Sequence, residues 1–306
     1  MTAPTYAIVD WGTSSFRSWS IDSTGNILST DQNSSGMSTL GPDEFTSVLE
    51  KSMENLSVSQ SVPVVICGMA GAAQGWLEAP YVDIPTELNE IHLSAVKPTN
   101  TARDVWIIPG LAQKKMDAPD VMRGEETLLF GAQLLGAGDG VFCMPGTHSK
   151  WAFVLGGRVE SFQTSMTGEV FALLSKTSTL ASYITDDVGD ITTDPAFAIA
   201  VHEALNNPHQ ILNFLFSIRS APLLSEAARG PGLAARLSGL LIGLEIAGML
   251  STNLTKVSLI ASGEISKAYE AALKISGMSV TVLDADELIR AGLTHYAQLI
   301  TGHRQD

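Results

Sequence analysis

Cysteine and positive charge are both scarce in this sequence. It contains two cysteines, Cys67 and Cys143, and each lies inside or at the end of an apolar, strand-like run. This placement predicts buried free thiols rather than a disulfide or a metal site. The 18 Lys and Arg residues are outnumbered by 32 Asp and Glu residues, which gives a net charge of −14. A nucleic-acid or anionic-membrane partner would need clustered basic residues, so we expect neither kind of partner.

Targeting segments and low-complexity tracts are also lacking. The first residues, Met1-Thr-Ala-Pro-Thr, lead directly into a strand-like run, so no secretory signal peptide is expected. The most apolar long stretch, 233–250, contains Arg236 and Glu245, which indicates a buried helix rather than a membrane span. With 306 residues, of which 45% are hydrophobic, the chain is typical of a globular cytoplasmic protein with two domains.

Two similar glycine turns begin the two halves of the chain. The first follows the run Tyr6-Ala-Ile-Val and reads Asp10-Trp-Gly-Thr-Ser; the second follows Val141-Phe-Cys-Met and reads Pro145-Gly-Thr-His-Ser. Each is followed by another strand-like run, a further turn and a third such run. Turns of Gly, Thr and Ser direct backbone N–H groups and hydroxyls outward, and phosphates are their usual occupants. Two such turns, one from each half, predict an ATP-using enzyme.

The pattern of strands and helices is duplicated as well. Hydrophobic periodicity and turn signals predict strands at 6–12, 15–22, 26–31, 63–68, 105–108, 257–261 and 280–284, with three more across 141–163. They predict helices at 42–56, 125–135, 233–250, 264–275 and 286–300, a helix from Thr167, a helical middle at 175–230, and a charged loop before Glu125. This α/β pattern is similar to the actin-like (ribonuclease H-like) architecture, in which the nucleotide lies in a cleft between two domains, here 1–138 and 139–306.

Asp10 and the residues after it carry the chemistry expected of the first turn. A carboxylate at the end of the first strand can hold Mg²⁺, directly or through water, and the metal would neutralise the phosphates that are transferred. Gly12, Thr13 and Ser14 can donate hydrogen bonds to the γ-phosphate. An aspartate that only caps a tight turn is the structural alternative, and the second glycine turn argues against it.

The second half supplies the remaining contacts expected for the nucleotide. Pro145 stands where related turns often carry a carboxylate, so we expect a single Mg²⁺ held mainly by Asp10. Small residues that close the strand 257–261 can lie against an adenine ring. The residues assigned to the β-phosphate are Gly146, Thr147 and His148, and those assigned to adenine are Ser262 and Gly263.

Transfer to an alcohol requires a carboxylate that accepts the hydroxyl proton or orients the hydroxyl. The segment 121–127 places Glu125 and Glu126 at the start of a helix, where the helix dipole favours negative charge. We expect Glu126 to be the base in preference to Glu125, and an acidic pair that only caps the helix is the structural alternative.

An acceptor site is expected at the glycine-rich loop 68–76. It offers backbone donors, an amide and an indole face for a polyol, although a tight packing loop would look the same. Basic residues inside motifs of this acidic chain could pair with a substrate carboxylate or a phosphate, and the sequence does not distinguish between them. The acceptor residues expected here are Gly68, Gln74 and Trp76, and the basic candidates are Arg17, Arg123 and Lys150.

An ordered set of motifs makes the chain resemble one family over nearly its whole length, from Tyr6 to about Ala297. The set is D-W-G-T-S-S-F-R, C-G-M-A-G-A-A-Q-G-W, W-I-I-P-G-L, V-M-R-G-E-E-T, M-P-G-T-H-S-K-W, S-M-T-G-E and L-S-G-L-L-I-G-L-E-I. It is similar to the 2-dehydro-3-deoxygalactonokinase family. The resemblance implies ATP-dependent phosphorylation of 2-dehydro-3-deoxy-D-galactonate at its 6-hydroxyl, in galactonate catabolism. The carboxylate of that sugar acid would explain a basic residue near the acceptor.

Three other functions are compatible with the same motifs. A kinase for another keto-deoxy sugar acid or an amino sugar would use the same residues. A phosphatase of the exopolyphosphatase type would use water as acceptor, but long polyphosphate usually calls for a basic channel, and the sequence shows no Lys/Arg run. A non-enzymic actin-like nucleotide switch would need large extra interaction segments. The sequence leaves the oligomeric state open, with a homodimer as one option.

Overall fold

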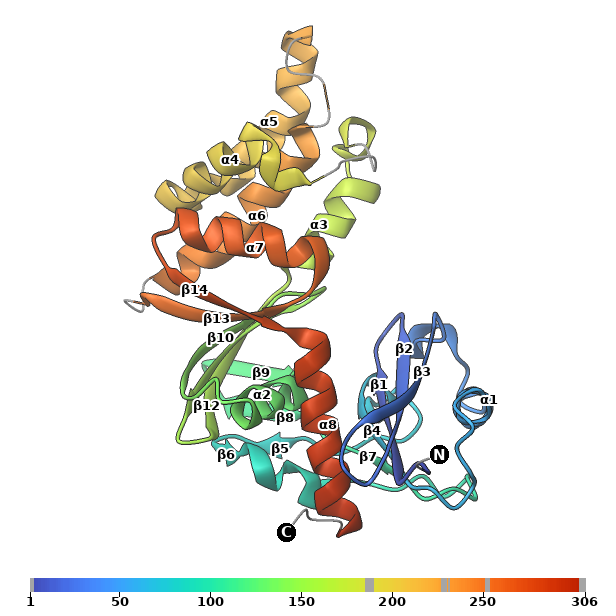
Figure 1. Ribbon diagram of the computed structural model, residues 1–306. Helices are drawn as coiled ribbons and strands as arrows, with labels where there is room; N and C mark the ends of the chain where they lie inside the picture. Colours follow the sequence, from blue (N-terminus) through green and yellow to red (C-terminus); the bar gives the residue numbers. More distant parts are fainter. Residues whose placement is uncertain (1–2, 185–189, 227–229, 231, 251–253, 303–306) are drawn as a thin grey trace. The chain divides into compact units, whose positions relative to one another are not determined.

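The chain divides into two units of packed strands and helices (Figure 1). The computed structural model describes residues 3–184, 190–226, 230, 232–250 and 254–302. The first unit comprises Met1–Asp139, Phe153–Phe162 and Ala285–Asp306, and the second comprises Gly140–Ala152 and Gln163–Asp284. The first change of unit lies beside the expected boundary at 138/139. The segment 153–162 and the last helix, however, group with the first unit.

A five-stranded sheet organises the first unit in the order β3-β2-β1-β4-β7. Its first three strands form an antiparallel meander, whereas β4 and β7 run parallel to β1. The strands are β1 (Tyr6–Trp11), β2 (Phe16–Ile21), β3 (Ile27–Asn33), β4 (Val64–Gly68) and β7 (Val105–Ile107), close to the predicted ranges. The central strands β1 and β4 are buried, as their continuous apolar runs predict.

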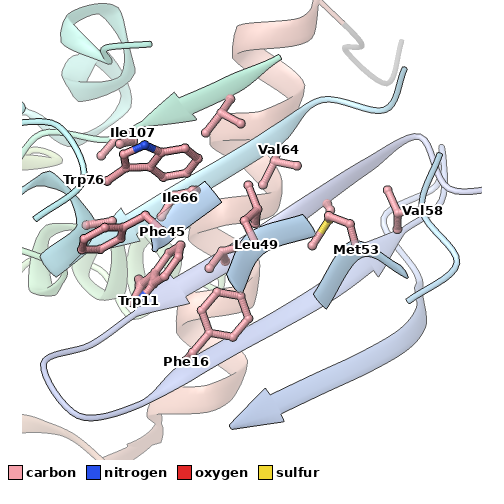
Figure 2. Packing of buried hydrophobic residues seen from close by; sticks show 14 of the residues in the cluster. Trp11, Phe16, Phe45, Leu49, Met53, Val58, Val64, Ile66, Trp76 and Ile107 are labelled. Carbon is pink, nitrogen blue, oxygen red and sulfur yellow. The ribbon is translucent and has the colours of Figure 1, made fainter. Parts of the chain in front are cut away.

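One face of this sheet is covered by helix α1 (Phe45–Asn55). The helix buries Phe45, Leu49 and Met53, whose spacing of four residues forms a single apolar stripe. Figure 2 shows Phe45 beside Trp11 and Trp76, with Leu49 and Met53 farther along the same cluster. The ring centroids of Trp11 and Phe45 are 5.1 Å apart, and Phe45 stacks on Trp76 at 6.3 Å. The aromatic cluster therefore joins the first strand, α1 and the loop after β4.

Helices α2 (Glu125–Leu134) and α8 (Ala285–Thr301) pack against each other, and α8 also packs on β1 and β4 (Figure 1). Two glycines permit the contact. A Cβ atom added at Gly131 would lie 2.0 Å from the Leu288 carbonyl oxygen, and one added at Gly292 would lie 2.3 Å from that of Thr127. Only a residue without a side chain allows the two backbones to approach so closely. This contact sets the position of the first turn of α2.

The segment before α2 differs from the prediction, because the expected charged loop is a β-hairpin. Strands β8 (Leu111–Lys115) and β9 (Ala118–Met122) pair antiparallel, and the short strand β5 (Val82–Asp83) pairs with β8. Charges near the tip and Pro119 in β9 hide the hairpin in the sequence. The proline is accommodated because β9 is the edge strand of this small sheet. Strand β6 (Thr86–Glu87) and the 3₁₀ segment Leu88–Ser94 were also not predicted.

The second unit begins with the second glycine turn and continues into alternating helices and strands. Its strands β10, β13 and β14 are parallel, in the order β14-β13-β10. Strands β11 and β12 are divided between the two units. The strands are β10 (Gly140–Met144), β11 (Ser149–Leu155), β12 (Arg158–Ser165), β13 (Lys256–Ala261) and β14 (Ser279–Asp284). The helices are α3 (Thr167–Lys176), α4 (Pro195–Asn206), α5 (Ile211–Leu224), α6 (Gly232–Leu250) and α7 (Gly263–Ile275). Parts of the middle segment expected to be helical, 185–189 and 227–229, lie outside the described residues.

Helix α6 is the long apolar helix that the sequence indicates. It is the one helix among the described residues that is long and apolar enough to cross a membrane, and 72% of that window is buried inside the protein. Gly239 lets α4 approach, because a Cβ atom there would lie 2.5 Å from the Phe197 carbonyl oxygen. Arg236 forms an ion pair with Glu203 at 2.8 Å. The burial of α6 confirms its prediction as a core helix.

Candidate active site

The first glycine turn connects β1 to β2, and backbone hydrogen bonds from residues outside the turn hold it in place. The Gly12 N–H donates to the Ser15 carbonyl at 2.9 Å, and the carbonyls of Gly12 and Thr13 accept from the N–H groups of Met37 and Ser38 at 3.0 and 2.9 Å. The side chains of Thr13 and Ser14 are exposed. The backbone of the turn is thus held by three hydrogen bonds while Thr13 and Ser14 are exposed, which suits a phosphate contact.

Asp10 lies at the end of β1 beside Arg17, its cross-strand neighbour on β2. Arg17 donates from Nε and Nη2 to Asp10 Oδ2, at 3.2 and 2.6 Å. Its third nitrogen, Nη1, donates to Asp286 in the first turn of α8. Arg17 was expected among the residues that could hold a substrate anion. The structure instead shows its guanidinium engaged by two carboxylates of the protein.

Glu125 and Glu126 begin α2 but lie in different environments. Glu126 is fully buried; its Oε2 accepts from the Gly124 N–H at 2.7 Å and its Oε1 from the Thr127 hydroxyl at 3.0 Å. Burial, with the charge on Glu125 as the second cause, raises the pKa of Glu126 to about 8. Glu125 is half-buried and accepts from the Arg123 N–H at 2.9 Å. Glu125 is therefore the more accessible carboxylate of the pair.

Cys67, at the end of β4, lies close to Asp10 and is also influenced by the charge of Glu126. Its Sγ donates to Asp10 Oδ1 at 3.8 Å. Burial raises the pKa of its thiol, and the charges on Asp10 and Glu126 raise it further. The next residue, Gly68, has φ = 89°, and a Cβ atom there would lie 2.6 Å from the Trp11 carbonyl oxygen. The ends of β1 and β4 and the start of α2 thus meet in one place. Both cysteines are free and buried, as predicted.

The acceptor loop after β4 is only partly as expected. Gln74 is exposed and available to a ligand. The Trp76 ring is 9% exposed within the aromatic cluster, and its indole N–H donates to Asn100 Oδ1 at 2.9 Å. This burial, with Phe45 stacked on the ring, disfavours Trp76 as a substrate platform, and its role stays a prediction. Arg123 lies over the Tyr81 ring at 4.4 Å and donates to the Ala79 carbonyl at 2.8 Å, so it packs beside the loop.

The second glycine turn is held by the start of α3. The Glu169 N–H donates to the Thr147 carbonyl at 2.9 Å, and a Cβ atom added at Gly168 would lie 2.3 Å from the Gly146 carbonyl oxygen. The His148 ring, half-exposed, pairs with the Glu169 carboxylate at 2.6 Å. Lys150, on β11, is 5% exposed and directs Nζ to the His148 carbonyl at 3.4 Å. Its burial disfavours Lys150 as a residue that meets a free substrate.

Glu245, on α6, is a functional candidate that the sequence reasoning treated only as a charge within a helix. Its Oε1 accepts from the Ser149 hydroxyl and the Trp151 indole at 2.7 and 2.8 Å. Its Oε2 accepts from the Tyr269 hydroxyl at 2.8 Å and from the Thr167 hydroxyl. The carboxylate thus joins β11, α3, α6 and α7 around the second turn. A lone acid in an apolar helix was the available signal, because a buried charge requires partners.

A pocket of about 260 Å³ opens next to this second turn. Its walls are mainly apolar and come from α3, α6 and α7, with Tyr269 joining it to the Glu245 network. Ser262 and Gly263 do not line the pocket, but the two residues that follow them do. The lining residues are Gly146, Thr167, Gly168, Phe171, Ile191, Ser238, Leu241, Ile242, Glu264, Ile265, Ala268 and Tyr269. A mainly apolar lining beside a glycine turn suits an apolar ring system attached to a phosphate.

Comparison with solved structures identifies the fold. The chain aligns with a crystal structure from Sinorhizobium meliloti at a TM-score of 0.92 and 43% identity, covering 98% of both chains; that protein is provisionally assigned as a 2-dehydro-3-deoxygalactonokinase. A 12% identical activator of the 2-hydroxyisocaproyl-CoA dehydratase from Clostridium difficile, solved with ADPNP, has a TM-score of 0.50 over 98% of each chain and shows the fold alone. The α/β fold is that of the actin-like ATPases and sugar kinases, as predicted.

Sequence comparison then identifies the family. The chain matches the 2-keto-3-deoxy-galactonokinase family over residues 10–296. It is 44% identical over 302 residues to the "probable 2-dehydro-3-deoxygalactonokinase DgoK1" of Rhizobium meliloti (strain 1021), covering 98% of each chain. It is 32% identical over 297 residues to the 2-dehydro-3-deoxygalactonokinase of Escherichia coli (strain K12), covering 96% of this chain and 98% of the relative. The protein belongs to the 2-keto-3-deoxy-galactonokinase family and is a phosphotransferase with an alcohol acceptor.

The buried Glu126 predicts a pH-dependent contribution to stability. Its folded-state pKa of about 8 is above the ordinary value of 4.5, so the folded protein keeps a proton that the unfolded chain releases. The contribution is therefore favourable at low pH and is lost as pH rises from about 4.5 to about 8. Glu126→Gln removes this loss, and we expect it to gain on the order of 1 kcal/mol or more relative to the wild type over that range.

The measurement is thermal unfolding of both proteins between about pH 5.5 and about pH 8. Glu54→Gln, which changes an exposed carboxylate on α1, is the matched control and should show no such trend. Parallel pH profiles for Glu126→Gln and the wild type would contradict the raised pKa.

Proposed function

We propose that this protein transfers the γ-phosphoryl group of ATP to the 6-hydroxyl of 2-dehydro-3-deoxy-D-galactonate. The observation that carries the proposal is the 44% identity, over 98% of each chain, to a relative with that enzyme name. The two braced glycine turns and the acidic pair at the start of α2 supply the groups that such a reaction needs. A cytoplasmic location and a homodimer stay predictions.

Mg²⁺ is the metal that this chemistry implies, and the residues fit it. The described residues contain no group of three or more His, Cys, Asp or Glu side chains that could hold a metal by themselves. In a kinase site Mg²⁺ takes one or two carboxylates and otherwise water and substrate phosphates. Asp10 is the carboxylate beside the first turn and would hold the ion. When bound, Mg²⁺ neutralises charge on the phosphates.

The nucleotide base and ribose are assigned to the pocket between α3, α6 and α7. Its apolar walls suit adenine, and Gly146 at its edge brings the second turn toward the phosphates. Thr147 and His148 continue that turn, and Glu169 orients the His148 ring. This assignment moves the expected adenine contact from Ser262-Gly263 to Glu264 and Ile265, in the first turn of α7.

We assign the role of base to Glu125, which reverses the expected order of the pair. A base must be ionised and must reach the acceptor hydroxyl. The raised pKa of Glu126 leaves it mostly protonated at neutral pH, and its two oxygens already accept hydrogen bonds from Gly124, just before α2, and from Thr127 within it. Glu125 is partly exposed at the same helix end. Glu126 then has a structural role: its hydrogen bonds to Gly124 and Thr127 hold the first turn of α2, which carries Glu125.

The acceptor is placed beside the loop after β4. Gln74 is exposed there, and Gly68 brings the loop next to Trp11 and the candidate metal carboxylate. Among the three basic candidates, Arg123 lies against this loop, whereas Arg17 is held by two carboxylates and Lys150 is buried on β11. Arg123 is half-buried overall, unlike the buried Lys150, and its Nε and Nη1 have no hydrogen-bond partner among the described residues. We therefore assign the substrate carboxylate to Arg123.

The decisive test of the function is ADP release from MgATP with the galactonate substrate, its gluconate epimer, or no acceptor. Stimulation that is strongest with the galactonate compound is expected. Equal stimulation by both epimers would leave a kinase of broader specificity. Hydrolysis that no acceptor stimulates would overturn the proposal and favour a phosphatase, and nucleotide binding without turnover would favour a nucleotide switch.

The choice of base predicts unequal effects of two isosteric substitutions. Glu125→Gln removes the carboxylate that faces the acceptor, so we expect kcat to fall by about 10²-fold or more. Glu126→Gln is the matched control and should reduce kcat by less, because the Glu126 side chain is buried and both its oxygens already accept hydrogen bonds. Steady-state kinetics of both variants checks the order, and a larger loss for Glu126→Gln would restore the order expected from the sequence.

The nucleotide pocket predicts a selective effect on ATP. Ile265 lines the pocket and is partly exposed, so Ile265→Asp should fold, place a carboxylate against adenine and raise the KM for ATP by about tenfold. The KM for the sugar acid should stay unchanged. Ile199→Asp changes an exposed isoleucine of the same unit that does not line the pocket and serves as control. Equal effects of the two substitutions would argue against the pocket as the ATP site.

A further inference from the structure

A cluster of two carboxylates and one guanidinium lies at the candidate metal position. Arg17 bridges Asp10 on β1 and Asp286 on α8, as described above. Side-chain exposure rises outward through the cluster, from 18% for Asp10 to 31% for Arg17 and 46% for Asp286. With two negative groups and one positive group, the cluster carries one net negative charge. Arg17 thus has two anionic partners, one deeper and one nearer to solvent.

The inner ion pair conflicts with metal binding. Asp10 Oδ2 accepts two hydrogen bonds from Arg17, and Oδ1 faces the Cys67 thiol. Mg²⁺ held by either oxygen, directly or through a water, would lie close to the Arg17 guanidinium, and two cations beside one carboxylate repel each other. A nucleotide-bound Mg²⁺ and Arg17 therefore compete for Asp10.

We propose that Arg17 leaves Asp10 and keeps its ion pair with Asp286 when Mg²⁺-nucleotide binds to Asp10. Asp286 is then the positioning residue that holds the Arg17 guanidinium while Asp10 binds the metal. The proposal rests on the role of Asp10 in the proposed function. Asp286 is suited to this task because it sits in the first turn of α8, where the helix dipole stabilises a carboxylate. Helix α8 packs on β1, the strand that carries Asp10.

The proposal predicts opposite changes in Mg²⁺ affinity for Asp286→Asn and Arg17→Gln. Without the Asp286 charge, Arg17 would be left half-buried and poorly paired beside a dication, so Asp286→Asn should weaken Mg²⁺ binding. Without the Arg17 charge, Asp10 has no internal competitor, so Arg17→Gln should strengthen Mg²⁺ binding. Since the pairs are partly exposed, we expect changes of about three- to fivefold in each direction.

The experiment is calorimetric titration of the full-length protein with ADP at a series of Mg²⁺ concentrations, which yields the Mg²⁺ concentration at half-maximal affinity. This readout does not require turnover. Asp83→Asn, which removes an exposed ion pair with Lys114 in the same unit, is the matched control and should leave the value unchanged. Asp286→Glu, which keeps the charge, should restore most of the wild-type value.

The outcomes separate this proposal from the proposed function. Asp10→Asn should abolish the Mg²⁺ dependence; if it does not, the metal role of Asp10 fails and the exchange fails with it. If Asp10→Asn acts as expected but Asp286→Asn behaves like the wild type, the exchange alone is refuted. An Arg17→Gln protein with weaker Mg²⁺ affinity would show that Arg17 supports the metal instead of competing with it, and would also overturn the proposal.

Discussion

The backbone contact between α2 and α8 is the constraint on which the first site depends. Gly131 and Gly292 allow the two helices to approach to a distance that no side chain would permit. The contact places the first turn of α2 beside the ends of β1 and β4, and it places the first turn of α8 beside β2. The acidic pair of α2 and the Asp286 carboxylate of α8 are both positioned in this way. Residues separated by more than half of the chain thus contribute to one small region.

Each unit contains a buried carboxylate, and the two carboxylates have different surroundings. Glu126 lies in an environment that raises its pKa, because burial removes water and Glu125 adds a neighbouring negative charge. Glu245 is nearly as buried but accepts hydrogen bonds from four side chains. The first arrangement disfavours charge at the start of α2, whereas the second holds four elements around a pocket. Identical side-chain chemistry therefore has a different consequence in each unit, and the neighbours decide which.

Much of the fold follows from local signals. The strands β1 and β4 are continuous apolar runs, α1 has an apolar stripe, and the glycine turns stand between alternating runs, so each was predictable within a few residues. The hairpin β8–β9 was not, because an edge position tolerates Pro119 and charges that locally indicate a loop. The positions of the phosphate turns and of the acidic pair were predictable as sequence motifs. Their roles as ligand-binding and catalytic groups stay predictions.

The sequence by itself determined the family, the fold class and the order of the motifs, because these depend on residue types at fixed spacing along the chain. Tertiary structure alone decided which side chains in those motifs can reach a ligand. The Trp76 indole is a residue type on which sugars often stack, yet its ring is packed against Phe45 in the core. Arg17 is the expected cation, yet Asp286 reaches it from the far end of the chain. Glu125 and Glu126 are adjacent and chemically identical, and only burial separates them. The exposure of a side chain and its ion pairs with distant residues depend on how the elements pack. The spacing of residues along the chain does not reveal them.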